Sequence, residues 1–170
     1  MTAEEVIINN DNKEFVLKAV KETGKLLEYA SPRLQDDKEV VLEALKQDGE
    51  SLEFASTRLK DDKEVIMLGV ENAPWTICYT SERLKADREV VFESCKKYGQ
   101  ALYFASKELR ADREVVKSAV ENKGIIIKYA SKELQNDKEL ALIAVKQNKQ
   151  AYHFISEDLK QDEDIKALME

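Results

Sequence analysis

A unit of 25 residues recurs along the chain, and this repeat constrains the fold more than any other feature. Four series of residues keep the same spacing without a single insertion, which chance does not produce, so the chain is a tandem repeat. The first series is Asn12, Asp37, Asp62, Asp87, Asp112, Asp137 and Asp162; the others are aromatic (Tyr29, Phe54, Tyr79, Phe104, Tyr129, Phe154), serine (Ser31, Ser56, Ser81, Ser106, Ser131, Ser156) and leucine (Leu34, Leu59, Leu84, Leu109, Leu134, Leu159).

Each unit predicts a first helix that begins at the Asp or Asn. This residue type is a good N-cap, and the acid two positions later lies where the helix dipole favours negative charge. In the second unit the helix is expected over residues 38–46, with an apolar face that includes Val40, Val41, Ala44 and Leu45. Four glycines follow the first helices at the position where a left-handed C-terminal cap is favoured, so we expect that conformation there: Gly24, Gly49, Gly99 and Gly124.

A second, shorter helix is expected over residues 50–55, with Leu52 and Phe54 facing inward and Glu53 facing outward. Ser56 then caps a last turn. A lone unit offers roughly seven apolar side chains at about 1.5–3 kcal/mol each, against roughly 1.5 kcal/mol of ordering entropy per residue, so it should not fold without neighbours. The sequence therefore predicts an all-α fold, an α-α solenoid or superhelix of about six two-helix repeats of 25 residues.

The repeat also predicts the domain organisation. Residues 1–10 do not fit the repeat and are expected to form an N-terminal cap, with Val6, Ile7 and Ile8 covering the first exposed edge. Residues 11–170 are expected to form a single helical-repeat domain, with units that start near residues 12, 37, 62, 87, 112 and 137 and a half unit from residue 162. In that half unit Lys166 replaces an apolar residue, which suits a helix facing water. Imperfect caps leave weak end-to-end self-association open.

Composition argues against several classes of partner. The chain carries 34 acidic and 27 basic residues, interleaved along its length, whereas nucleic-acid binding needs a concentrated basic face. The N-terminus has no signal-peptide pattern, and the longest uncharged stretch, residues 72–81, is too short to cross a bilayer. Two cysteines do not make a disulfide framework. We therefore expect a cytoplasmic protein without nucleic-acid or membrane partners.

No pattern of residues predicts catalysis, a metal site or a cofactor. The Asp-x-Glu pairs recur in every unit at a helix start, which indicates capping, because a catalytic dyad is made once in one special environment. Cys95 occupies an apolar position of the repeat and is expected to be buried. Cys78 and His153 share an outward position but lie three units apart, too far to act together or to complete a zinc site. No phosphate-binding glycine motif occurs, so we do not expect an enzyme.

The candidate binding residues come from the positions that vary between units. Two outward positions of the second helix, three residues apart, form a stripe along the predicted stack. The middle of this stripe is rich in aromatic and apolar residues, which is typical of an interface. The residues proposed to bind are Trp75, Cys78, Tyr98, Tyr103, Ile125 and Lys128. Two alternatives stay open. In the first, Trp75, which follows Pro74, folds inward to fill space; in the second, Tyr103 and Lys128 are ordinary surface residues with no role in binding.

The repeated motif resembles a catalogued family of tandem α-helical repeats that is filed as a domain of unknown function. Residues 112–116 (Asp-Arg-Glu-Val-Val) and 102–106 (Leu-Tyr-Phe-Ala-Ser) are similar to the family signature, and the similarity covers nearly the whole chain. The departures are local: Ala73-Pro74 and Lys149 stand where other units have their glycine step. The resemblance implies the fold and no activity.

Solenoids present extended surfaces, so the function expected from the sequence is a non-enzymatic helical-repeat scaffold that binds a protein or peptide. The first alternative is a structural spacer, or a fragment of a larger repeat protein with no binding role of its own. A remote alternative is an enzyme with an unrecognised pocket that collects acids from several units.

Overall fold

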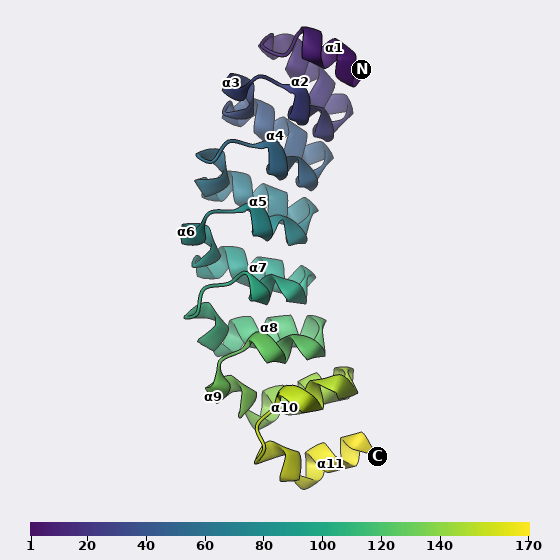
Figure 1. The fold of residues 1–170 in the computed structure, drawn as a ribbon, viewed down its shortest axis with the longest axis vertical. Helices are drawn as coiled ribbons and strands as arrows, with labels where there is room; N and C mark the ends of the chain where they lie inside the picture. The colour runs from purple at the N-terminus through teal and green to yellow at the C-terminus, as the bar shows by residue number, and fades with distance from the viewer. The chain divides into compact units, whose positions relative to one another are not determined.

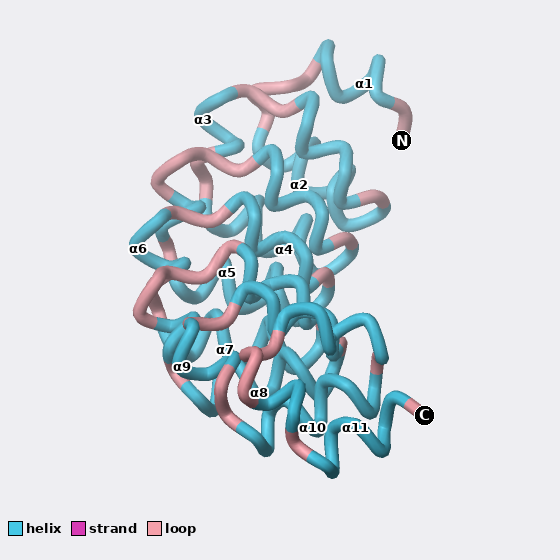
Figure 2. Tube along the Cα trace, turned by 60° about the horizontal axis from the view of Figure 1, so that its bottom comes forward, coloured by secondary structure: helices cyan, strands magenta, loops and turns pink.

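The computed structural model describes all of residues 1–170, which form α-helices and 3-10 helices and no β-strand (Figures 1 and 2). The chain divides into two compact units, which we call unit 1 (Met1–Leu84) and unit 2 (Lys85–Glu170) and describe separately. None of the helices combines the length and the apolar character that a membrane crossing requires.

The α-helices are labelled α and the 3-10 helices η. Unit 1 contains α1 (Ala3–Ile8), α2 (Lys13–Glu22), η1 (Gly24–Tyr29), α3 (Pro32–Gln35), α4 (Lys38–Gln47), η2 (Gly49–Phe54), η3 (Leu59–Asp61), α5 (Lys63–Asn72) and η4 (Pro74–Tyr79), and α6 (Glu82–Lys85) lies at the junction. Unit 2 contains α7 (Arg88–Lys97), η5 (Gly99–Tyr103), η6 (Leu109–Ala111), α8 (Arg113–Asn122), η7 (Gly124–Tyr129), α9 (Lys132–Gln135), α10 (Lys138–Gln147), η8 (Lys149–Phe154), η9 (Leu159–Gln161) and α11 (Glu163–Met169).

Within each unit, consecutive repeats pack on one another in chain order. In unit 1, α2, α4 and α5 form one layer and η1, η2 and η4 form a second (Figure 1). In unit 2, α7, α8, α10 and α11 form one layer, and η5, η7 and η8 form the other. Four of the 3-10 helices also pack against the α-helix of the repeat that follows: η1 against α4, η2 against α5, η5 against α8 and η7 against α10. The prediction of an all-α solenoid is confirmed.

The Asp residues start the helices as predicted. Asp37 accepts hydrogen bonds from the backbone N–H groups of Glu39 at 3.1 Å and Val40 at 3.3 Å. The same carboxylate has a second partner that the sequence analysis did not identify, because the Lys13 ammonium lies 2.7 Å from Asp37 and 2.8 Å from Glu39. The Asp-Lys/Arg-Glu motif therefore caps its own helix and also ties it to the preceding repeat. Equivalent pairs within a unit join Lys38 to Asp62 and Glu64, Arg113 to Asp137 and Glu139, and Lys138 to Asp162 and Asp164.

The second helix of each 25-residue repeat is a 3-10 helix, whereas the sequence pattern was interpreted with α-helical periodicity. Residues three apart eclipse each other in a 3-10 helix and form straight rows. One row is buried, as Gly49, Leu52 and Ala55 show, while the Glu53 side chain is exposed on another. The side chain of the fourth residue of this helix is fully buried in five repeats, at Leu27, Leu52, Ile77, Leu102 and Ile127.

The glycines do not adopt the left-handed conformation expected of them, since no glycine has a positive φ. They are required by close packing instead. A Cβ on Gly99 would lie 2.5 Å from the carbonyl oxygen of Ala119 in the next repeat, and one on Gly49 would lie 2.8 Å from that of Gly69. These distances are too short for any side chain, so the backbone of a 3-10 helix touches the backbone of the following α-helix.

The N-terminal residues form α1, capped reciprocally by Thr2 and Glu5. Val6 is fully buried, whereas Ile7 and Ile8 are 52% and 81% exposed, so the expectation that all three would cover the edge is wrong. A short helix contacts its neighbours with one face, and three consecutive residues, which span about 200° around the helix axis, cannot all lie on it. At the other end Lys166 is exposed beside buried Ile165, as expected. The predicted single repeat domain stays a prediction.

Candidate functional site

The six residues proposed as a binding stripe fall in both units. Trp75 and Cys78 belong to η4 in unit 1. Trp75 is 44% exposed and its Nε1 donates a hydrogen bond of 3.1 Å to Glu50, so the alternative that it folds inward is wrong. Cys78 lies three residues later, half-buried. The remaining four residues belong to unit 2.

Those four residues line one shallow groove of about 240 Å³ along η5 and η7, which we call the η5–η7 groove. Its lining comprises the four predicted residues (Tyr98, Tyr103, Ile125, Lys128) and five others (Gln100, Phe104, Lys123, Ile126, Tyr129). Tyr98 has an extended backbone between α7 and η5, which places it beside the start of η5. The structure therefore brings together residues from two consecutive repeats that the sequence could only place on one face.

Three aromatic rings organise this groove. Tyr103 is 56% exposed, yet its ring packs edge-on against Phe104, with centroids 5.1 Å apart, and against Tyr129, with centroids 5.0 Å apart. Such edge-to-face contacts stabilise ring positions beyond simple burial. The exposed Tyr103 ring is thus held in place before any ligand binds.

Phe104 and Tyr129 line the groove but are not among the predicted binding residues. Both belong to the aromatic series that defines the repeat, for which the sequence predicts an inward-facing position. In the structure both are half-buried, and one side of each ring is left to line the groove. No signal in the sequence separates a half-buried ring from a fully buried one at a repeated position.

A second hollow lies next to the groove and shares Lys128 with it. This η7–η8 hollow has a volume of about 330 Å³. It is lined by Lys128, Lys132, Gln135, His153, Phe154, Ile155, Ser156, Glu157 and Lys160. The sequence placed His153 at an outward position shared with Cys78 but did not predict this surface.

Lys128 connects the two surfaces. Its ammonium lies 4.7 Å from the centroid of the Tyr129 ring and 6.0 Å from that of Phe154, both within the range of a cation–π contact. The side chain therefore bridges an aromatic residue of η7 and one of η8. Lys128 is well exposed, so the same ammonium is accessible to a ligand.

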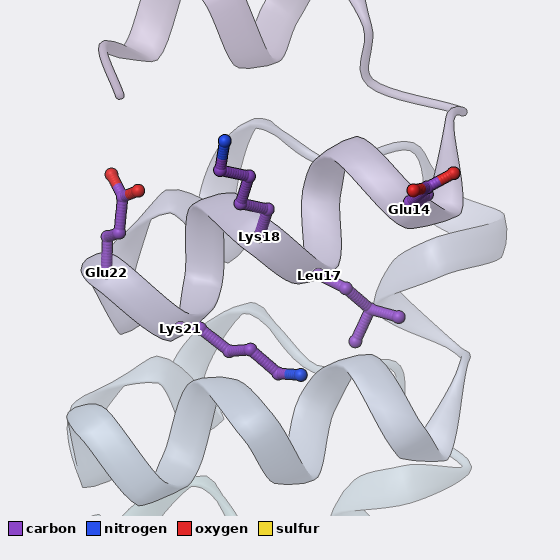
Figure 3. Close-up of a pocket in the computed structure, with 5 residues that line it drawn as sticks. All are labelled: Glu14, Leu17, Lys18, Lys21 and Glu22. Carbon is purple, nitrogen blue, oxygen red and sulfur yellow. The ribbon is translucent and has the colours of Figure 1, made fainter.

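A further hollow of about 480 Å³ lies on α2 in unit 1 and is lined by Glu14, Leu17, Lys18, Lys21 and Glu22. Figure 3 shows that these side chains diverge: Lys18 and Glu22 point to one side of α2, and Leu17 and Lys21 point to the opposite side. Glu22 already accepts a hydrogen bond of 2.8 Å from the N-terminal amino group. The five residues therefore do not converge on a common ligand.

The groups considered for catalysis have structural roles in this fold. The Asp carboxylates of the repeat accept helix N–H groups, as Asp37 and Asp112 do. Cys95 is fully buried, as predicted, and burial raises the pKa of its thiol to about 12, which opposes formation of a thiolate. No group of three or more His, Cys, Asp or Glu side chains is arranged to hold a metal ion.

Comparison with known proteins identifies one family. The profile of a domain of unknown function, DUF4116, matches residues 12–60, 62–110 and 112–165. No curated protein and no solved structure matches. Each match spans two 25-residue repeats, and the structure alternates with the same double period: the turn after the second helix is α-helical in α3, α6 and α9 and 3-10 in η3, η6 and η9.

Proposed function

Because the chain belongs to the DUF4116 family, whose function is unknown, we propose its role from its own surface: a non-enzymatic helical-repeat scaffold that binds a protein or peptide partner. The partner contacts the η5–η7 groove of unit 2. The observation that carries this proposal is the convergence of Tyr98, Tyr103, Ile125 and Lys128 on one concave surface.

The composition of the groove supports a protein ligand. Tyr residues are enriched among the side chains that dominate binding energy at protein interfaces, and a ring that is already held loses little entropy on binding. Tyr103 meets both conditions, because it is largely exposed and packs against two other rings. A groove of about 240 Å³ suits one or two side chains of a peptide.

The proposal of a non-enzymatic role is supported by how the carboxylates are used. A general base needs a carboxylate within reach of a substrate proton. The repeated Asp carboxylates instead accept backbone N–H groups and pair with Lys or Arg, as Asp137 does with Leu140 N–H and Arg113. We place the protein in the reducing cytoplasm, a setting supported by two cysteines that form no disulfide.

The test is the affinity of a partner captured by pull-down and then measured with purified protein by calorimetry. Tyr103→Ala removes the most exposed ring of the groove and is expected to weaken binding about tenfold or more. Glu28→Ala is the matched control, because Glu28 is exposed at the same position of a repeat in unit 1. Trp75→Ala tests whether unit 1 contributes.

Circular dichroism establishes that each variant is folded. Unchanged affinity in folded Tyr103→Ala protein would contradict the proposed site. A complete failure to capture a partner would favour the structural-spacer alternative.

A further inference from the structure

The charge of the two adjoining surfaces in unit 2 differs in sign from that of the whole chain. The chain has a formal net charge of −7. Among the residues that line the η5–η7 groove and the η7–η8 hollow, the only carboxylate belongs to Glu157. The basic residues there are Lys123, Lys128, Lys132, Lys160 and His153. An acidic protein thus carries a basic surface around its most exposed aromatic groove.

The ammonium groups of this surface differ in how far they are neutralised. Lys160 pairs with Glu157 at 2.6 Å. Lys132 donates to the neutral amide oxygen of Gln135 at 3.0 Å, and Lys128 lies over two aromatic rings. Neither contact cancels a positive charge, so Lys128 and Lys132 retain the capacity to attract a carboxylate.

We propose that the η5–η7 groove and the η7–η8 hollow together bind one extended acidic peptide segment. An apolar side chain of the peptide occupies the groove between Tyr98, Tyr103 and Ile125, and Asp or Glu side chains contact Lys128 and Lys132. This inference rests on the proposed function and names the chemistry of its partner. The shared residue Lys128 makes the two surfaces one continuous site.

The observations favour a short acidic peptide over a nucleic acid, although aromatic rings beside lysines also bind single strands. A nucleic acid is a long polyanion, and its phosphates would continue past the site onto a chain with an excess of acids. A short peptide can place its carboxylates beside Lys128 and Lys132 without extending further along the acidic chain. The partly exposed Ile125 also offers an apolar contact for an aliphatic or aromatic side chain.

The experiment is selection from a random dodecapeptide display library against the full chain at low salt. The expected result is enrichment of Asp and Glu beside an apolar residue among the selected peptides. The same selection against Lys128→Glu/Lys132→Glu should lose this acidic bias. Lys128→Gln, which removes the charge and keeps a polar side chain, should weaken a selected peptide by about threefold to fivefold in fluorescence anisotropy. Lys146→Gln is the control, since Lys146 is exposed in unit 2 outside both surfaces.

The outcomes separate this inference from the proposed function. Peptides that depend on Tyr103 but carry no acidic bias would overturn the inference and leave the binding groove intact. Peptides whose recovery is insensitive to Tyr103→Ala would overturn both. Displacement of a selected peptide by labelled decauridylate at a similar concentration would overturn the choice of peptide in favour of a nucleic acid. Weakening of binding with rising salt supports the inference.

Discussion

Units 1 and 2 repeat the same fold but differ in the side-chain contacts that the conserved-position serine of one repeat makes with the preceding repeat, for example Ser56 with Asp36 in unit 1. In unit 1 the Arg58 guanidinium lies 3.0 Å from the Asp36 carboxylate, which also accepts a hydrogen bond from the Ser56 hydroxyl. This Ser-Asp-Arg cluster occurs in each repeat of unit 1, at Ser31-Asp11-Arg33, Ser56-Asp36-Arg58 and Ser81-Asp61-Arg83. In unit 2 the positions of the Asp and Arg are occupied by Ala86 and Glu108, Ala111 and Glu133, and Asn136 and Asp158.

The main chain at the same place does not differ. The Ser56 N–H donates to the Gln35 carbonyl at 3.0 Å in unit 1, and the Ser131 N–H donates to the Arg110 carbonyl at 2.8 Å in unit 2. The fold is therefore maintained by backbone contacts that every repeat makes, and the charged cluster is added to them. The Asp and the Arg are present together in unit 1 and absent together in unit 2, which suits a cluster in which each side chain is the partner of the other.

The largest effect is expected from the contact that both units share. Gly49→Ala places a Cβ 2.7 Å from the Cβ of Ala73 and 2.8 Å from the carbonyl oxygen of Gly69, so the repeats must move apart. We expect a loss of about 3 kcal/mol in the free energy of unfolding, measured by urea denaturation. Gly99→Ala in unit 2 should cost a similar amount, since its Cβ would meet Ala119 at 2.5 Å.

Gly69→Ala is the matched control for this prediction. Its Cβ would lie 3.2 Å from the end of the Leu52 side chain, and its next neighbours, on Thr76 and Leu45, lie at ordinary contact distances of 3.6 Å and 3.8 Å. Ala also favours a helix interior over Gly by about 1 kcal/mol. We expect unchanged or slightly increased stability. A similar loss in Gly69→Ala and Gly49→Ala would show that close backbone packing is not what selects glycine.

A smaller effect is expected from building the cluster of unit 1 into unit 2. Ser131 is already present, so Ala111→Asp with Glu133→Arg supplies the two missing groups. The double variant should raise the melting temperature by about 1–3 °C, because exposed ion pairs contribute little. Ala111→Asp alone should give no gain, since it places a second acid near Glu133. Strictly additive single effects in a double-mutant cycle would contradict the expected geometry.

The smallest effect concerns acid sensitivity. The hydrogen bonds from Ser56 and Arg58 hold the pKa of Asp36 below its usual 3.8. A carboxyl whose pKa is depressed on folding contributes stability above its usual pKa, and this contribution is lost as the pH falls through the folded value. Asp36→Asn should therefore lose stability less steeply than the parent chain as the pH falls below 3.8, measured by urea midpoints. Equal slopes would contradict the prediction.

Asn is a suitable replacement in that experiment because the chain already contains the arrangement. In unit 2 the Ser156 hydroxyl hydrogen-bonds to the Asn136 side-chain oxygen at 2.5 Å. The variant therefore keeps an acceptor for the Ser56 hydroxyl and removes the titrating charge together with its ion pair to Arg58. The difference in slope then reports the contribution of the Asp36 carboxylate to acid sensitivity.

The candidate site was predictable only in part. The register of the repeat placed Tyr103, Ile125 and Lys128 on one outward face, because every 25-residue repeat presents the same positions to solvent. The sequence did not indicate that Phe104 and Tyr129 would line the groove, since half-burial depends on where the next repeat packs. It also gave no sign of the η7–η8 hollow, whose lysines come from η7, α9 and η9.

By itself the sequence determined the repeat length, the helix starts and the buried positions. These follow from local chemistry: Asp caps the helix that it precedes, and apolar residues at helical spacing must be covered. Only the tertiary structure decided that the second helix is 3-10, that Gly49 and Gly99 are required by a neighbouring backbone, and that Lys13 pairs with Asp37. Each of these depends on the distance between residues about 25 positions apart, which the packing of successive repeats sets and no local pattern encodes.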